Sequence, residues 1–243
     1  VGGVSSGLIS QPEGRTPTRQ PMRYKLEFRI KVLEHLFAGR PFMYLGYRML
    51  KQVILITGTP CVGKTSVARM LAAKLGGEYI NLTDLAIKEN LILGRDEKRA
   101  SFIIDDKNMR KRIREIVEKS ETENIIVDGH YAASVVPEGL VTRVFVLRRN
   151  PIELRKLMEE RGFSGNKLWE NLASEILDIC LVEAINIHGA EKVCEVDVTG
   201  KSVEETVAEI IKLLKNPEEC HVGIVDWLSE LERKGIMEEY LKI

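Results

Sequence analysis

The stretch Val53-Ile54-Leu55-Ile56-Thr57-Gly58-Thr59-Pro60-Cys61-Val62-Gly63-Lys64-Thr65 decides how this chain folds. Its first four residues form a continuous apolar run, as expected of a parallel strand that is buried on both faces. A loop follows, and residues 65–75 then carry apolar side chains at helical spacing. Strand, loop and helix in this order, with the pattern Gly-x-x-x-x-Gly-Lys-Thr, predict a loop whose backbone N–H groups hold phosphate.

Each residue type in this loop has a physical role in holding phosphate. Gly58 and Gly63 let the backbone turn tightly, so that successive N–H groups point inward. Lys64 is expected to reach the β- and γ-phosphates, and the Thr65 hydroxyl is expected to bind Mg²⁺. The N-terminus of the helix adds about half a positive charge. Cys61 stands where glycine is common, but a small thiol leaves the loop intact because the contact comes from the backbone.

Outside the loop, predicted strands and helices alternate over residues 52–215. Besides the strand at 53–56, strands are expected at residues 78–80, 124–128, 143–147 and 192–198. Helices are expected at residues 65–75, 84–89, 105–119, 151–160, 166–188, 203–214 and 224–242. This alternation is typical of an α/β protein with a doubly wound parallel sheet.

Two polar residues follow the third predicted strand. Asp128 ends that strand at its carboxyl side, the edge at which open α/β sheets bind ligands. A carboxylate there can hold Mg²⁺, directly or through water. His130 comes two residues later and is expected near the γ-phosphate, where it would orient a water molecule or an acceptor. The alternative for both residues is an ordinary solvated turn.

Arginines form a second group of candidates. Arg148 and Arg149 end the fourth predicted strand, and Arg161 follows the next helix. Planar guanidinium groups neutralise the charge that spreads over a phosphoryl group during transfer. Arg161 is the preferred candidate, Arg148 and Arg149 are weaker ones, and Arg155 on the helix is expected to be structural. Solvent-facing arginines are the alternative.

Charge balances over the whole chain but not along it. The chain has 36 basic and 36 acidic residues, and residues 1–51 hold nine of the basic and three of the acidic ones. The acidic remainder does not suggest broad, nonspecific nucleic-acid binding. The four cysteines form no Cys-x-x-Cys pair, which argues against a metal site, and their number and spacing suit a reducing cytoplasm. The sequence contains no run of eighteen apolar residues, so no membrane span is predicted.

Residues 1–48 are expected to be an extension outside the enzyme. Residues 1–23 lack any hydrophobic period and are expected to be disordered. Residues 24–32 alternate apolar and polar side chains, which suits a strand. Because Met49 falls three residues before the first strong strand, the extension is interpreted as a misplaced gene start or as an Arg-rich targeting peptide.

Several motifs together resemble the atypical adenylate kinases called isoenzyme six. They are Leu55-Ile56-Thr57-Gly58-Thr59-Pro60 through Thr65, Tyr79-Ile80-Asn81 with Asp84-Leu85-Ala86, Ile126-Val127-Asp128 with His130, Val144-Phe145-Val146-Leu147-Arg148, Glu159-Glu160-Arg161-Gly162, Lys167-Leu168, Asn171 and Glu175-Ile176. The resemblance covers about residues 50–216 and is more specific than the loop alone. It implies a three-layer P-loop kinase fold with a five-stranded parallel sheet.

The resemblance also implies how the chain is divided. A kinase domain would span residues 49–216, with a monophosphate-binding segment at about 81–104, a short lid at about 160–170, and a C-terminal helical segment at 217–243. The implied ATP-binding residues are Cys61, Gly63, Lys64, Thr65, Ser66 and Arg161. The implied catalytic residues are Lys64, Asp128, His130 and Arg161, with Thr65 and Asp128 on the metal.

The implied activity is transfer of the terminal phosphate of ATP to AMP with Mg²⁺, with broad nucleotide tolerance and a slower ATPase. Members of this family also assist late maturation of the small ribosomal subunit and 3′ processing of its rRNA, together with small-subunit ribosomal protein eleven. They would be cytoplasmic in archaea and largely nuclear in eukaryotes. An assembly factor that is mainly an ATPase, and a P-loop kinase of another small molecule, are the alternatives.

Two departures from ordinary adenylate kinases stand out. Asp128-Gly129-His130-Tyr131-Ala132 replaces Asp-Gly-Phe-Pro-Arg, so the arginine that helps to hold the monophosphate is absent from that place. The lid is too short for a zinc-bearing form, and no cysteine cluster lies in it.

Overall fold

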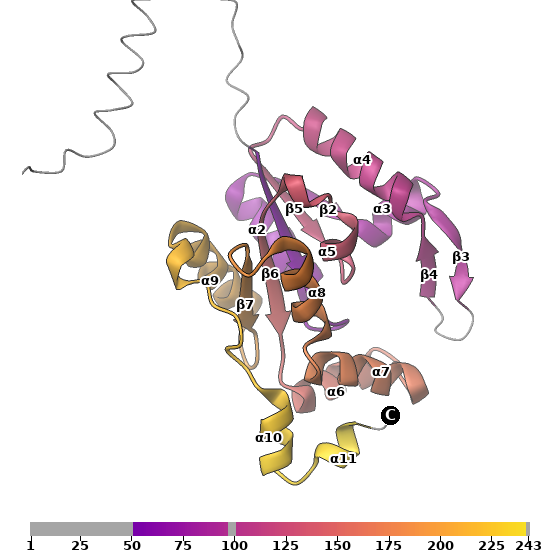
Figure 1. The fold of residues 1–243 in the computed structure, drawn as a ribbon, viewed down its shortest axis with the longest axis vertical. Coiled ribbons are helices and arrows are strands. Elements are labelled where there is room, and N and C mark those ends of the chain that lie inside the picture. The colour runs from indigo at the N-terminus through magenta and orange to yellow at the C-terminus, as the bar shows by residue number, and fades with distance from the viewer. Residues whose placement is uncertain (1–50, 97–100, 242–243) are drawn as a thin grey trace, which may run out of the picture. The chain divides into compact units, whose positions relative to one another are not determined.

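A central parallel sheet organises the chain in the computed structural model, which describes residues 51–96 and 101–241 (Figure 1). Its five strands lie in the order β2-β5-β1-β6-β7. They are β1 (Gln52–Thr57), β2 (Glu78–Asn81), β5 (Asn124–Asp128), β6 (Val141–Arg148) and β7 (Val193–Asp197). The predicted five-stranded parallel sheet is thereby confirmed, whereas the extension at 1–48 and its expected strand lie outside the described residues.

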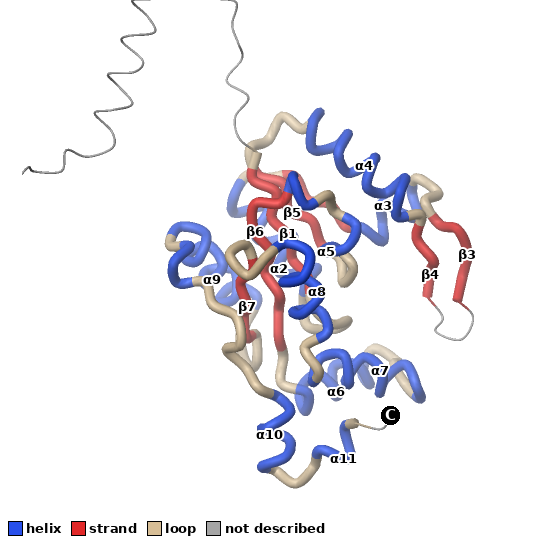
Figure 2. Tube along the Cα trace, viewed as in Figure 1, coloured by secondary structure: helices blue, strands red, loops and turns tan. Residues whose placement is uncertain are grey.

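Helices cover both faces of this sheet, which gives three layers (Figure 2). Alternate residues of β1 point to opposite faces, so Ile54 and Ile56 join one apolar cluster while Val53 and Leu55 join the other. The first cluster includes residues of α2 (Lys64–Leu75), α6 (Pro151–Glu160), α7 (Gly165–Ile176) and α9 (Val203–Lys215). The second includes residues of α3 (Leu82–Lys88), α4 (Asp106–Lys119), α5 (Ala132–Val135) and α8 (Ile179–His188).

The strand register determines which residues meet at the carboxyl edge of the sheet. Asp128 at the end of β5 is paired with Ile56 of β1 on one side and with Asn81 of β2 on the other. The phosphate-binding loop leaves β1 directly after this point. The sheet therefore brings Asp128 to the base of the loop, as the sequence predicted.

The predicted helix at 166–188 is wrong, because the structure divides it into α7 and α8. Asp178 between them adopts a left-handed backbone with φ 58°, and its Oδ1 accepts a hydrogen bond from Nη2 of Arg148 at 2.5 Å. The last helix is also divided, into α10 (Trp227–Arg233) and α11 (Met237–Tyr240), and Gly235 between them has φ 68°. Helical periodicity alone does not reveal such breaks, since they depend on distant partners or on single residues.

An antiparallel hairpin that the sequence did not indicate lies in the segment 81–104. Its strands are β3 (Ile92–Asp96) and β4 (Ser101–Ile104), and they form a separate two-stranded sheet. The hairpin extends to one side of the central sheet in Figure 1. Leu93, Phe102 and Ile103 on it are exposed. This segment is thus a distinct projection and not only a helix with a loop.

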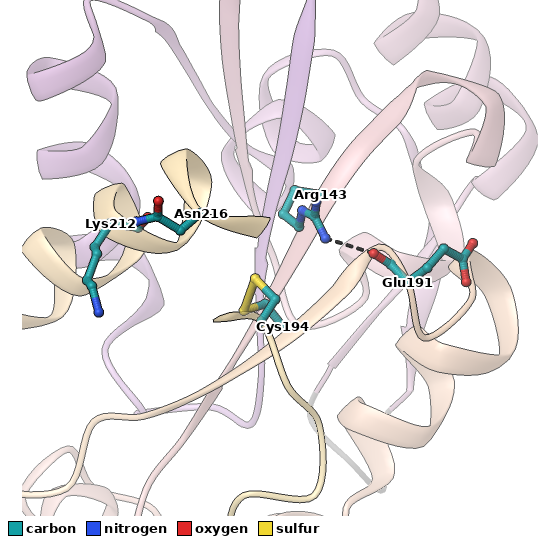
Figure 3. The surroundings of a disulfide bond; sticks show 6 residues. Arg143, Glu191, Cys194, Lys212 and Asn216 are labelled. Carbon is teal, nitrogen blue, oxygen red and sulfur yellow. Dashed lines mark hydrogen bonds between the residues drawn. A yellow bond between two sulfur atoms is a disulfide. The ribbon is translucent and has the colours of Figure 1, made fainter. Parts of the chain in front are cut away.

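A disulfide bond joins Cys194 of β7 to Cys220, with the two Cα atoms 4.9 Å apart (Figure 3). The next residue on each side adds a hydrogen bond, from the backbone N–H of Glu195 to the carbonyl of His221 at 2.9 Å. Cys61 and Cys180 are free. The expectation that the cysteine spacing suits a reducing cytoplasm did not anticipate this pair, because partners separated by 26 residues leave no local pattern.

Reduction of this disulfide should lower the free energy of unfolding by about 3 kcal/mol, since a closed loop of this size restricts the unfolded chain. Urea denaturation of the protein with the disulfide intact, and again after reduction by a thiol, measures the effect. The double variant Cys194→Ala, Cys220→Ala is the control, and its stability should not respond to the reductant. Equal stability of oxidised and reduced wild-type protein would contradict the prediction.

Within the described residues, the structure contains no helix of the length and apolar character that crossing a membrane requires.

Candidate active site

The phosphate-binding loop connects β1 to α2 through three residues with positive φ. They are Gly58 at 133°, Cys61 at 72° and Gly63 at 112°. A Cβ atom at Gly58 would collide with the carbonyl oxygen of Leu147, so the neighbouring strand requires glycine there. Cys61 occupies the backbone region that favours glycine, which explains why glycine is common at this place in such loops.

Lys64 lies at the first position of α2 and folds back over the loop. Its Nζ donates hydrogen bonds to the carbonyl oxygens of Gly58 at 2.9 Å and Thr59 at 2.8 Å. Removal of water around the ammonium group lowers the pKa of Lys64, and nearby acidic groups including Asp128 oppose that shift. Two carbonyl oxygens hold the Lys64 amino group inside the loop, at the N-terminus of α2, where the predicted phosphates would lie.

Asp128 is almost fully buried, with 1% of its surface exposed. Its Oδ2 accepts three hydrogen bonds, from Thr65 Oγ1 at 2.7 Å, Asn81 Nδ2 at 2.9 Å and Tyr79 Oη at 3.1 Å. The sequence predicted that Asp128 and Thr65 act together. It placed Asn81 only as a possible cap of the next helix and as the start of the monophosphate-binding segment, and it gave Tyr79 no role, although both are in the motif of β2 that resembles the kinase family. The cap is observed, since the Asn81 side chain accepts from the backbone N–H of Asp84.

The Thr65 hydroxyl and the Asp128 carboxylate provide adjacent hard oxygen atoms of the kind that Mg²⁺ prefers. Among the described residues, no group of three or more His, Cys, Asp or Glu side chains could enclose a metal ion. Mg²⁺ in phosphate-transfer sites is commonly bound by one or two protein groups, with phosphates and water completing its shell. The residues present therefore fit a magnesium ion that binds together with nucleotide phosphate.

His130 follows Asp128 on the loop that leads to α5. Its ring meets the ring of Tyr131 edge-on, with centroids 4.8 Å apart. His130 is exposed at the surface, but protein atoms around the ring displace part of its water and Lys64 adds a positive charge. Together they lower the pKa of His130 to about 4. The ring is then neutral at pH 7, and one nitrogen can accept a hydrogen bond.

A proton NMR titration should show the His130 ring gaining its proton near pH 4 and not near 6.5. The variant His130→Gln removes one histidine resonance and so assigns it. Since the folded pKa is below the ordinary value, protonation favours the unfolded chain, and stability is lost as the pH falls from about 6.5 toward 4. A resonance that titrates at 6 or above would show that the ring is protonated much more readily than its surroundings imply.

The arginine candidates have different surroundings. Arg148 is completely buried, and its guanidinium group pairs with Glu175, Asp178 and Glu195, so the structure makes it a core residue. The weaker functional prediction for Arg148 is therefore wrong, because three acidic partners from later elements draw it inward. Arg149 does lie beside the loop, since its Nε donates to the carbonyl oxygen of Val62 at 3.4 Å.

Arg161 is exposed at the C-terminal end of α6, where the chain enters the predicted lid. Gly162, which follows Arg161, and Gly165, the first residue of α7, have φ of 80° and 56°. The role of Arg161 on ATP stays a prediction. Arg155 on α6 pairs with Glu159 and Glu239, which agrees with the structural role expected of it.

A cavity of about 500 Å³ lies beside His130 and next to the hairpin. It is lined by Thr83, Phe102, Ile103, Ile104, Asp106, His130, Tyr131, Ser134 and Val135. The buried hydroxyl of Tyr131 has no hydrogen-bond partner among the described residues. Apolar walls with a few polar groups are typical of sites for small molecules, and Thr83, Phe102, Ile103 and Ile104 in the wall of this cavity belong to the segment expected to bind the monophosphate.

Known proteins resemble this chain over most of the described region. A family described as AAA domain matches residues 54–178. A protein of Methanocaldococcus jannaschii named "Putative adenylate kinase" is 40% identical over 177 residues, which cover 73% of this chain and 93% of that protein. A protein of the same name from Pyrococcus furiosus is 41% identical over 181 residues, covering 74% of this chain and 93% of that protein.

Among solved structures, a thymidylate kinase from Candida albicans aligns with a TM-score of 0.47 and 16% identity. The alignment covers 69% of this chain and 92% of that one.

Proposed function

We propose that this chain transfers the terminal phosphate of ATP to AMP. The chain belongs to the family described as AAA domain, together with the archaeal relatives named "Putative adenylate kinase". One observation carries the proposal. Asp128 hydrogen-bonds Thr65 of the phosphate-binding loop, and His130 two residues later lines the cavity at the hairpin. A donor phosphate on the loop and an acceptor in the cavity would meet between these residues.

On the donor side, the backbone N–H groups from Cys61 to Ser66 would hold the phosphates of ATP. Lys64 would leave the carbonyl oxygens of Gly58 and Thr59 and place its charge on the β- and γ-phosphates. Thr65 and Asp128 would hold the magnesium ion, which neutralises charge on the phosphate oxygens when bound. Lys64 and Thr65 lie at the start of α2, and Asp128 lies at the end of β5.

On the acceptor side, His130 would orient the attacking phosphate oxygen of AMP, because its neutral ring can accept or share a hydrogen bond. Ala132, at the place where ordinary adenylate kinases carry arginine, is fully buried and contributes no charge. Arg161 on the lid would then supply the cation for the moving phosphoryl group. Closure of this short lid would exclude water.

A second function rests on the same geometry. His130 keeps contact with solvent, so it can orient a water molecule as well as an acceptor, and hydrolysis of ATP would follow. The motifs that resemble isoenzyme six support an assembly factor of the small ribosomal subunit, with small-subunit ribosomal protein eleven as partner. In that case the ATPase would be the main activity. The cytoplasm is the proposed location, or the nucleus if the source is eukaryotic.

A panel of acceptors separates these functions. The purified full chain is incubated with ATP, Mg²⁺ and each nucleoside monophosphate in turn, and ADP formation is compared with formation of free phosphate. The proposal expects ADP formation to rise strongly with AMP. If free phosphate forms at the same rate with and without AMP, the kinase proposal fails. Stimulation of that rate by the ribosomal protein would support the assembly factor.

A further inference from the structure

Glu175 of α7 gathers more hydrogen bonds than the motif around it suggests. Its side chain is 1% exposed. Oε2 accepts from Thr59 Oγ1 at 2.6 Å, and Oε1 accepts from Arg148 Nε at 2.9 Å, from the backbone N–H of Arg149 at 3.0 Å and from Trp227 Nε1 at 3.1 Å. One carboxylate therefore joins the phosphate-binding loop, the end of β6 and the C-terminal segment.

The contact to Thr59 is the one that reaches the nucleotide site. Thr59 is completely buried, and its carbonyl oxygen and that of Gly58 hold the Lys64 ammonium group. A side chain that fixes Thr59 thus fixes the part of the loop whose carbonyl oxygens hold the Lys64 side chain before nucleotide binds. We propose that Glu175 is a positioning residue, which acts through Thr59 to hold the loop in its phosphate-binding conformation. This rests on nucleotide binding by the loop and not on the identity of the acceptor.

The two carboxylate oxygens have different tasks, which makes the proposal testable. Oε1 faces three N–H donors, so the amide oxygen of a glutamine at this position would stay there. The amide NH₂ would then replace Oε2 and could only donate to the Thr59 hydroxyl oxygen. Thr59 would lose its charged acceptor, so the charge-assisted hydrogen bond would become a neutral one in the reverse direction, while the contacts to Arg148 and Trp227 remain. Glu175→Gln is therefore a selective change at Thr59.

Arg148 keeps other acidic partners when Glu175 becomes glutamine, so the core should survive the substitution. Its Nη1 donates to Glu195 Oε1 and its Nη2 to Asp178 Oδ1, each at 2.5 Å. Glu195 is buried like Glu175, and its Oε2 accepts from the backbone N–H of Ile224 at 2.8 Å. Glu195→Gln removes a negative charge next to the same arginine, but Glu195 lies on β7 and contacts the C-terminal segment instead of the loop. It is the matched control.

Calorimetric titration of the full chain with ATP and Mg²⁺, without AMP, tests the proposal. Loss of one charge-assisted hydrogen bond should raise the Kd of ATP about tenfold in Glu175→Gln and similarly in Thr59→Val. The double variant should bind no more weakly than either single one, because both remove the same contact. Thr59→Ser keeps the hydroxyl and should bind like wild type, and Glu195→Gln should change the Kd less than twofold.

Three results would overturn the proposal: additive losses in the double variant, an unchanged Kd in Glu175→Gln, or an equal loss in Glu195→Gln. Thermal unfolding is recorded for every variant. If Glu175→Gln does not fold, the comparison of Thr59→Val with Thr59→Ser still decides whether the hydroxyl matters. Because AMP is absent, failure of the kinase proposal would leave this test intact.

Discussion

Lys64→Met should lower the rate of ADP formation from ATP and AMP by a factor on the order of 10³, equivalent to about 4 kcal/mol of transition-state stabilisation. The ammonium group is held within the loop by the carbonyl oxygens of Gly58 and Thr59, at the place where phosphate oxygens would develop charge. Methionine has a similar shape but no charge and no donor. A coupled assay at saturating AMP measures kcat and the KM for ATP.

Lys74→Met is the matched control, because it makes the same change in the last turn of the same helix, α2, where the side chain is exposed. It should keep wild-type kinetics. Lys64→Arg should not restore activity, since a planar guanidinium group does not fit a pocket built around a compact ammonium group. If Lys64→Met keeps activity within tenfold of wild type, the loop does not act on the transferred phosphate.

The parts of the fold that the sequence predicted are those with local causes. Val53 to Ile56 and Ile125 to Val127 are continuous apolar runs, and they form the central buried strands β1 and β5. The spacing of Gly58, Gly63 and Lys64 alone predicts the phosphate-binding geometry of the loop. Asp128 follows from its place at the end of a strand, because the carboxyl ends of parallel strands meet at one edge.

What the sequence did not predict depends on partners that are far apart in the chain. Arg148 ends β6 at the ligand edge of the sheet, yet ion pairs with Glu175 and Glu195 hold its side chain in the core. The same network bends the chain at Asp178 and divides the expected helix. The motif Glu175-Ile176 does not indicate this network, since the donors to Glu175 come from positions 59, 148, 149 and 227. Buried ionic networks of this kind are visible only after the fold is known.

Asp128→Asn should reduce kcat by a factor on the order of 10² to 10³ and raise the Mg²⁺ concentration needed for half-maximal activity. The carboxylate accepts from Thr65, Asn81 and Tyr79 through one oxygen, and the amide oxygen of asparagine can still accept from the same donors. The substitution therefore removes charge more than it removes structure. Titration of activity with MgCl₂ at fixed ATP and AMP gives both quantities.

Asp197→Asn supplies the matched comparison for this prediction. Asp197 ends β7 at the same edge of the sheet, but its Oδ1 accepts from the backbone N–H and the hydroxyl of Thr199. Its loss should leave the dependence on Mg²⁺ unchanged. If Asp128→Asn and wild type have the same half-maximal Mg²⁺ concentration, Asp128 does not hold the ion. The carboxylate would then serve mainly to tie β2 and α2 to β5, and urea denaturation should show the loss as reduced stability instead.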